Sequence, residues 1–273
     1  YGRLSRRRSV SLETRAGHFV FARDLGQGAR RGLMLHCSLA HGGAWRGLAG
    51  AFDAEFTFAA PDFPSHGRSE LWDRQGRYHD ACTAVAVSFL RDDPIDLIGH
   101  SFGATVALRL ALEQPDRIRS LVLIEPVFFA VALADDPDFV SDMNVLEDVL
   151  AHEGRHAATR GFLQAWGGGL PWEMMPKESQ DDMASRIEVI SDAAPALYDD
   201  TAGLLAEGRL QALDIPVLLM RGDASPAVIE TINTGLARRI RSAQTAVIEG
   251  AGHMAPISNP KDCAVELRGF WAL

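Results

Sequence analysis

A serine flanked by glycines lies between a strand-like run and a helix-like run, in Gly-His-Ser-Phe-Gly at 99–103. Residues 95–98 have the character of a buried strand, and residues 104–113 have a helical pattern. This order is typical of the nucleophile elbow, a turn too tight for side chains at the glycine positions. Amides at the start of the helix can stabilise negative charge. The pattern predicts that Ser101 is a nucleophile, the alternative being an ordinary strand–turn–helix connection.

A base that activates the serine hydroxyl is predicted at His253. A lone serine is a poor nucleophile at neutral pH and needs a base within hydrogen-bond reach. His253 follows the strand-like run 245–248 in a loop with Gly250 and Gly252, and it precedes the last helix-like run. A histidine this late in the chain fits the order serine, acid, histidine. The alternative is a surface-loop histidine without a catalytic role.

The rest of the chain supplies the elements that must position these two side chains. Short apolar runs alternate with helical patterns in the first half and again near the end. This alternation predicts an α/β fold with a mostly parallel central sheet and helices on both faces. The predicted strands lie at 19–21, 32–36, 56–60, 95–98, 120–124, 215–220 and 245–248. One helix is predicted to begin near residue 45, and others are predicted at 81–90, 104–113, 228–238 and 260–271.

The alternating pattern stops after Pro126 and resumes near residue 214. Residues 127–213 contain no strand-like run, and helical stretches with charged faces, including 145–150 and 186–190, fill the segment. We therefore expect a core domain formed by residues 1–126 and 214–273, with residues 127–213 as a helical insertion.

Composition limits the partners of the protein. A net charge of −9 argues against nucleic-acid binding, which needs a basic surface. No run approaches the roughly 18 apolar residues of a membrane span, and no signal peptide is evident. The expected partner is a small-molecule substrate, and the sequence leaves a homo-oligomer open. A solvated tail, rather than an anion-binding arm, is expected from the early arginines Arg3, Arg6, Arg7 and Arg8.

The three cysteines, Cys37, Cys82 and Cys263, are odd in number and widely spaced. They form neither a disulfide framework nor a metal-binding pattern, so a reducing cytoplasm is the expected location. No motif implies a metal or an organic cofactor. The predicted chemistry therefore uses side chains and backbone amides alone.

Three motifs in this order resemble the α/β-hydrolase superfamily. They are the elbow at 99–104, the loop Asp-Phe-Pro-Ser-His-Gly-Arg-Ser at 62–69 and Gly-Ala-Gly-His at 250–253. The resemblance covers nearly the whole chain. It implies that residues 127–213 form a helical cap over the site.

The same resemblance implies an oxyanion hole made by two backbone amides. One donor is Phe102, directly after the nucleophile. The other follows a His-Gly pair in the family, and because this chain has His36-Cys37 there, the matching donor is Ser38. A rival is the glycine-rich segment 41–43, His-Gly-Gly. Cys37 itself is expected to be a packed thiol rather than a nucleophile.

The acid that orients His253 has two candidates. The usual family pattern, Gly-x-x-Asp, is altered to Gly-Asp-Ala-Ser at 222–225, which moves the carboxylate to Asp223 and leaves Ser225 in its usual place. Glu125 ends the apolar strand 120–124 and resembles the acid of haloalkane dehalogenases that use a glutamate there. A carboxylate at the end of an apolar strand needs a partner, and a catalytic histidine is a natural one. Glu125 is the favoured candidate over Asp223, the alternative for Glu125 being a more peripheral carboxylate at the sheet edge.

Large apolar side chains in the insertion are candidates for substrate contacts. They either line an apolar acyl pocket or pack the insertion against the core. These residues are Trp166, Trp172, Met175, Phe128 and Phe129.

These features favour hydrolysis of a carboxylic ester or a related acyl substrate. Serine at the elbow, instead of aspartate, argues against dehalogenase and epoxide hydrolase chemistry, which needs an alkyl-ester intermediate in this superfamily. An alternative is hydrolysis of a carbon–carbon bond or an enol-lactone, as in aromatic-degradation hydrolases. A third reading is a non-catalytic ligand-binding protein, because some plant hormone receptors reuse this fold.

Overall fold

A single eight-stranded sheet forms the centre of the computed structural model, which describes residues 10–136, 138–139, 143–167 and 170–273. The strand order is β1-β2-β4-β3-β5-β6-β7-β8, and all neighbours beyond β4 pair in parallel. The pairs β1–β2 and β2–β4 are antiparallel. The strands are β1 (Val10–Arg15), β2 (His18–Gly26), β3 (Arg30–Leu35), β4 (Phe56–Pro61), β5 (Ile95–His100), β6 (Ile118–Ile124), β7 (Val217–Gly222) and β8 (Ala243–Ile248).

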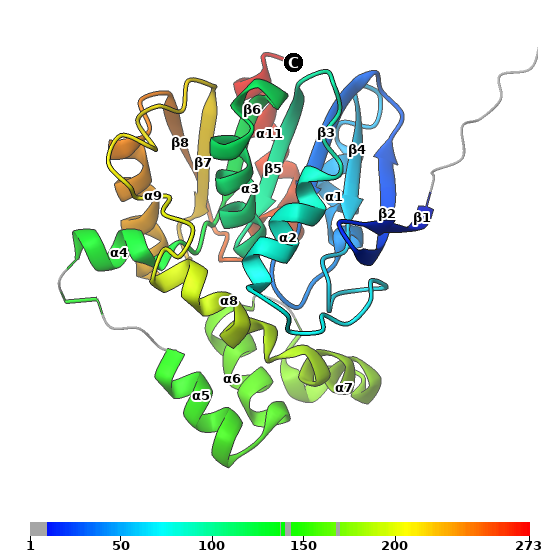
Figure 1. Ribbon diagram of the computed structural model, residues 1–273, viewed down its shortest axis with the longest axis vertical. Coiled ribbons are helices and arrows are strands. Elements are labelled where there is room, and N and C mark those ends of the chain that lie inside the picture. Colours follow the sequence, from blue (N-terminus) through cyan, green and yellow to red (C-terminus); the bar gives the residue numbers. More distant parts are fainter. Residues whose placement is uncertain (1–9, 137, 140–142, 168–169) are drawn as a thin grey trace, which may run out of the picture.

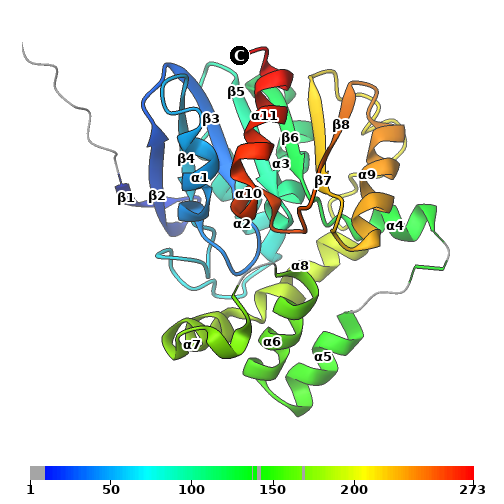
Figure 2. The ribbon, with the colours of Figure 1, turned by 180° about the vertical axis from the view of Figure 1, so that it is seen from behind.

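Helices cover both faces of the sheet (Figures 1 and 2). One face packs against α2 (Tyr78–Val87), α3 (Phe102–Glu113) and α9 (Ala227–Arg239), and the other against α1 (Arg46–Gly50), α10 (Ala255–Ser258) and α11 (Pro260–Trp271). Each face has its own apolar core, because the central strands are buried on both sides. The sequence-based prediction of an α/β fold with a mostly parallel sheet is confirmed.

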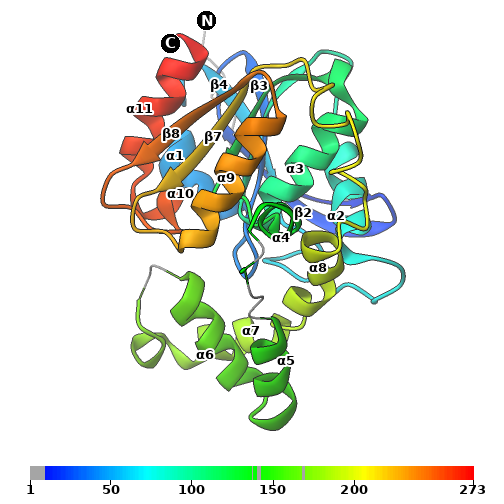
Figure 3. The same cartoon turned by 90° about the vertical axis from the view of Figure 1, so that its left-hand side faces the viewer.

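A helical insertion separates β6 from β7. It contains α4 (Phe129–Asp135), α5 (Met143–His152), α6 (Arg155–Trp166), α7 (Lys177–Arg186) and α8 (Val189–Tyr198). Figures 1 and 3 show α5, α6 and α7 beyond one end of the sheet, while α4 lies beside α9.

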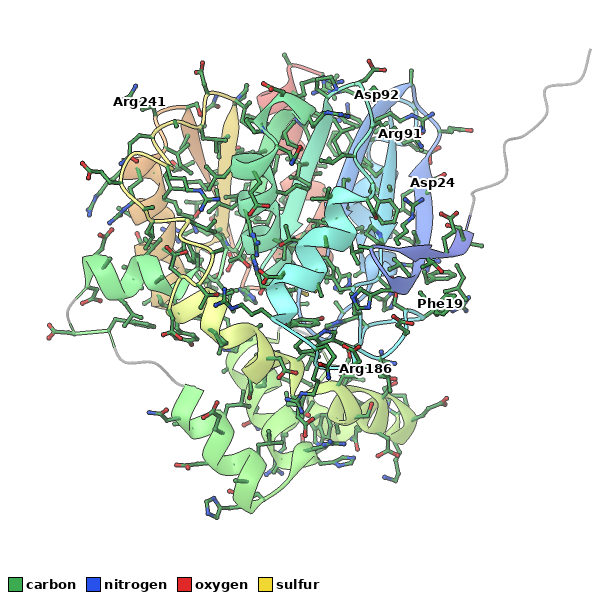
Figure 4. All side chains as sticks on the ribbon, viewed as in Figure 1. Phe19, Asp24, Arg91, Asp92, Arg186 and Arg241 are labelled. Carbon is green, nitrogen blue, oxygen red and sulfur yellow. The ribbon has the colours of Figure 1, made fainter. Side chains whose placement is uncertain are left out.

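Arg186, labelled in Figure 4, connects the insertion to the core. Its guanidinium donates to the backbone oxygen of Ser65 at 3.0 Å and to Asp182 within α7. The Arg186 side chain therefore bonds α7 to the loop that follows β4.

Two details differ from the sequence-based expectations. Strand β1 is not among the apolar runs predicted as strands, because most of its residues are polar and its side chains are mostly exposed. The stretch 186–190, expected to be helical, spans the junction between α7 and α8. The arginines at 3, 6, 7 and 8 lie outside the described residues.

No helix in the described ranges is long and apolar enough to cross a membrane. The three cysteines are all buried and unpaired by disulfides.

Candidate active site

Ser101 occupies a strained turn between β5 and α3. Its backbone φ of 55° and ψ of −119° fall in a region that costs a non-glycine residue of order 1–3 kcal/mol. A Cβ atom at Gly99 would lie 2.3 Å from the oxygen of Gly103, and one at Gly103 would lie 2.3 Å from the oxygen of Leu35. The Ser101 amide donates to the oxygen of Ile124 at 2.9 Å, which anchors the turn to β6. Both glycines are therefore required by close packing.

His253 lies between Ser101 and a carboxylate. Its Nε2 atom is 2.9 Å from Oγ of Ser101, and its Nδ1 atom is 3.0 Å from Oε2 of Glu125. Both His253 and Ser101 are buried, yet both line the same cavity. This arrangement lets Nε2 accept the serine proton while Nδ1–H donates to the carboxylate.

Glu125 is completely buried at the end of β6, with a positive φ of 53°. Its Oε1 atom accepts hydrogen bonds from the Gly222 amide at 2.5 Å and from the Ser225 hydroxyl at 2.7 Å. Its Oε2 atom is left to face His253. Sequence reasoning noted Ser225 only as the residue at the usual acid position, and the structure shows that it donates to Glu125.

Asp223 is exposed and does not reach His253. Its Oδ1 atom accepts from the Gly250 amide at 2.7 Å, three residues before His253. Of the two candidate acids, the structure brings Glu125 to the imidazole, whereas Asp223, after β7, is bonded to the loop that carries His253.

His100 is hydrogen-bonded to the loop that carries His253. Its Nε2 atom is 2.8 Å from the backbone oxygen of His253, so this nitrogen carries the hydrogen and donates. Burial lowers the pKa of His100 to about 3, so the ring is neutral at neutral pH. This hydrogen bond, which the sequence alone does not predict, links the turn at 99–103 to the loop that carries His253.

The loop after β3 presents Ser38 to the cavity that holds Ser101 and His253. Neighbouring amides already have acceptors. The Leu39 amide donates to Nε2 of His66 at 2.9 Å, and the Gly42 amide donates to Oδ1 of Asp62 at 2.8 Å.

The Gly43 amide donates to Nδ1 of His41 at 3.0 Å. Two amides of the rival segment 41–43 are therefore engaged within the protein. Ser38, by contrast, lines the cavity, and Phe102 follows Ser101 directly at the start of α3.

The buried ionisable side chains in and around this loop have shifted pKa values. Burial lowers the pKa of His36 to about 3 and that of His66 to about 4, so both rings stay neutral. For Asp62, burial opposes ionisation, but the hydrogen bond from Arg23 helps to bring the pKa below its usual value. Burial raises the pKa of Cys37 to about 12, which makes the thiol a packed group and a poor nucleophile at neutral pH.

A cavity of about 360 Å³ extends from Ser101 and His253 into the insertion. Of the five residues predicted to contact substrate, Phe129 and Trp166 line it. Phe128 is fully buried in the core beneath. Trp172 contacts the ring of His156, and neither Trp172 nor Met175 is among the residues that line the cavity. The sequence could not resolve this, because the lining depends on how each helix is rotated.

No cluster of three or more possible metal ligands occurs among the described residues. The cavity is lined mainly by apolar and aromatic side chains, and its lining also includes two exposed charged residues, Glu153 and Arg160.

The sequence is similar to known hydrolases. A model of the alpha/beta hydrolase family matches residues 33–266. Pimeloyl-[acyl-carrier protein] methyl ester esterase from Aeromonas salmonicida is 27% identical over 254 residues, which cover 87% of this chain and 94% of that protein. Lipase LipV from Mycobacterium tuberculosis is 39% identical over 108 residues, a match that spans only 40% of the lipase and 39% of this chain.

Solved structures share the fold at low sequence identity. A putative lipase from Acinetobacter baumannii superposes with a TM-score of 0.77 at 15% identity, covering 97% of this chain and 91% of that one. The haloalkane dehalogenase DatA from Agrobacterium tumefaciens gives a TM-score of 0.76 at 16% identity, covering 97% and 96%. At these identities the likeness establishes the architecture alone.

Proposed function

The chain belongs to the alpha/beta hydrolase family, and from this premise we propose that it hydrolyses a carboxylic ester through an acyl-enzyme formed on Ser101. The observation that carries the proposal is the continuous hydrogen-bonded series Ser101 Oγ, His253 and Glu125, with distances of 2.9 and 3.0 Å. The relatives that match over most of their length, and whose names describe an ester hydrolase, support the same reaction class.

The geometry supports a two-step reaction. Ser101 Oγ attacks the ester carbonyl carbon while His253 Nε2 takes the hydroxyl proton. The carbonyl oxygen becomes an oxyanion, which accepts hydrogen bonds from the amides of Ser38 and Phe102. Glu125 stabilises the imidazolium, which then donates its proton to the alcohol oxygen as the carbon–oxygen bond breaks.

Water completes the cycle. His253 removes a proton from a water molecule that attacks the acyl carbon, and the proton returns to Ser101 Oγ as the carboxylic acid leaves. Because the structure presents His253 Nε2 next to Ser101 Oγ, no rearrangement of either side chain is needed before the first step.

The proposal is tested with a panel of esters, lactones and diketones. Wild-type protein is expected to hydrolyse small aryl and alkyl esters, and Ser101→Ala is expected to lower kcat by at least about 10³-fold, as removal of a triad nucleophile does. If only the lactones or the diketones of the panel are cleaved, the protein is instead an enol-lactone or carbon–carbon bond hydrolase. Binding of a panel member without turnover would favour the ligand-binding alternative.

A further inference from the structure

Trp166, at the end of α6, is in ring contact with His253. The two ring centroids are 4.9 Å apart with an interplanar angle of 70°, an edge-to-face arrangement. Trp166 therefore borders the imidazole from the insertion side of the cavity.

Other aromatic rings hold Trp166 in this position. Phe129 contacts it edge to face at 5.8 Å, and Tyr198 stacks on Phe129 at 4.5 Å. These rings come from α4, α6 and α8, so the position of the indole beside His253 depends on the packing of all three helices.

The contact restricts the space for a leaving alcohol. His253 Nε2 must come within about 3 Å of the alcohol oxygen to donate its proton. Any substituent on that oxygen consequently lies beside the imidazole, where Trp166 already packs. A small alcohol fits this space, and a branched or cyclic alcohol meets the indole.

The acyl side of the ester has more room. From Ser101 the cavity continues between α5, α6 and α8, and its wall is mainly apolar. Burying the methylenes of a chain against this wall is favourable. The apolar wall includes Leu146, Val149, Phe162, Ile190 and Leu197.

We propose that Trp166 is a specificity-determining residue that restricts the enzyme to esters of small unbranched alcohols, while the cavity in the insertion takes an extended apolar acyl chain. This inference rests on the proposed ester hydrolysis and names the substrate class of the same site.

The test is kcat/KM for methyl hexanoate, cyclohexyl hexanoate and methyl acetate with wild-type, Trp166→Phe, Trp166→Leu and Trp166→Ala protein. Wild type is expected to prefer methyl over cyclohexyl hexanoate, and hexanoate over acetate. Shortening Trp166 is expected to improve the cyclohexyl-to-methyl ratio progressively, by at least tenfold in Trp166→Ala, within the range that a change of pocket size produces. The hexanoate-to-acetate ratio is expected to stay within threefold.

Trp172→Ala is the matched control, since Trp172 lies in the insertion against His156, outside the residues that line the cavity. It is expected to leave both ratios unchanged. If Trp166→Ala is poorly folded, the Phe and Leu variants still report the trend.

Equal losses on both hexanoates across the Trp166 series would overturn the inference, because Trp166 would then only position His253. An unchanged ratio, or the same change in Trp172→Ala, would also overturn it. Wild-type protein that cleaves none of the three esters contradicts the proposed function itself, which separates the two failures.

Discussion

At the scale of residues, the choice between two acids depends on one contact. Glu125 meets His253 Nδ1 at 3.0 Å, whereas Asp223 accepts an amide hydrogen bond from Gly250. The sequence supports either assignment, because both residues follow strand ends that lie side by side in the parallel sheet. The backbone at Glu125, with its positive φ, and the hydrogen bonds from Gly222 and Ser225 aim this carboxylate at the imidazole.

We predict that Glu125→Gln lowers kcat by about 10²–10⁴-fold, because a neutral amide no longer fixes the imidazole tautomer or stabilises the imidazolium. Asp223→Asn keeps an oxygen that can accept from Gly250 and is expected to change kcat by less than threefold. The measurement is steady-state hydrolysis of one ester by both variants at neutral pH. A larger loss in Asp223→Asn than in Glu125→Gln would assign the acid to Asp223.

At the scale of elements, apolar runs predict the strands and helices well, since the central strands are buried on both faces. The alternation of strand and helix also locates the insertion, because its helices carry charged faces. Strand β1 escapes this reasoning because its side chains are mostly exposed, and its place depends on pairing with β2. The residues that line the cavity escape it as well, because Phe128 and Phe129 are adjacent in sequence yet face the core and the cavity respectively.

The loop that presents Ser38 depends on a second loop, between β4 and α2. His66 in that loop accepts the Leu39 amide hydrogen, next to the Ser38 amide. We predict that His66→Phe lowers kcat about tenfold with little change in KM, since an oxyanion donor that is misplaced loses part of its effect in the transition state. His66→Gln retains an acceptor and is expected to recover most of the activity.

The readout is kcat and KM for one ester, with the unfolding midpoint measured in parallel. A rise in KM at constant kcat would contradict a role in the oxyanion loop. Equal activity of the Phe and Gln variants would do so as well.

At the scale of the whole molecule, several histidines are buried in the neutral form. Burial lowers the pKa of His36 and His100 to about 3 and that of His66 and His79 to about 4, against 6.5 for an exposed ring. At a pH between the lowered pKa of a buried ring and 6.5, that histidine binds a proton in the unfolded chain but not in the folded chain. Above pH 6.5 these histidines therefore do not lower the free energy of unfolding. As the pH falls from 6.5 towards the pKa values of the folded state, they lower it progressively.

We predict that the urea midpoint of unfolding falls steadily from pH 7 to pH 4, with each histidine contributing up to about 1.4 kcal/mol per pH unit. His79→Gln removes one such group, on α2, and is expected to flatten this dependence. A midpoint that is constant over this range would contradict the buried neutral state of these rings.

The central claim, that Ser101 is an activated nucleophile, is tested most directly by reaction with a fluorophosphonate probe followed by mass spectrometry of the peptides. The account predicts one label per chain, on Ser101, that forms rapidly in the wild type and Asp223→Asn, slowly in Glu125→Gln, and not at all in Ser101→Ala or in unfolded protein. Absence of labelling in folded wild-type protein, or a label on another residue that persists in Ser101→Ala, would contradict it.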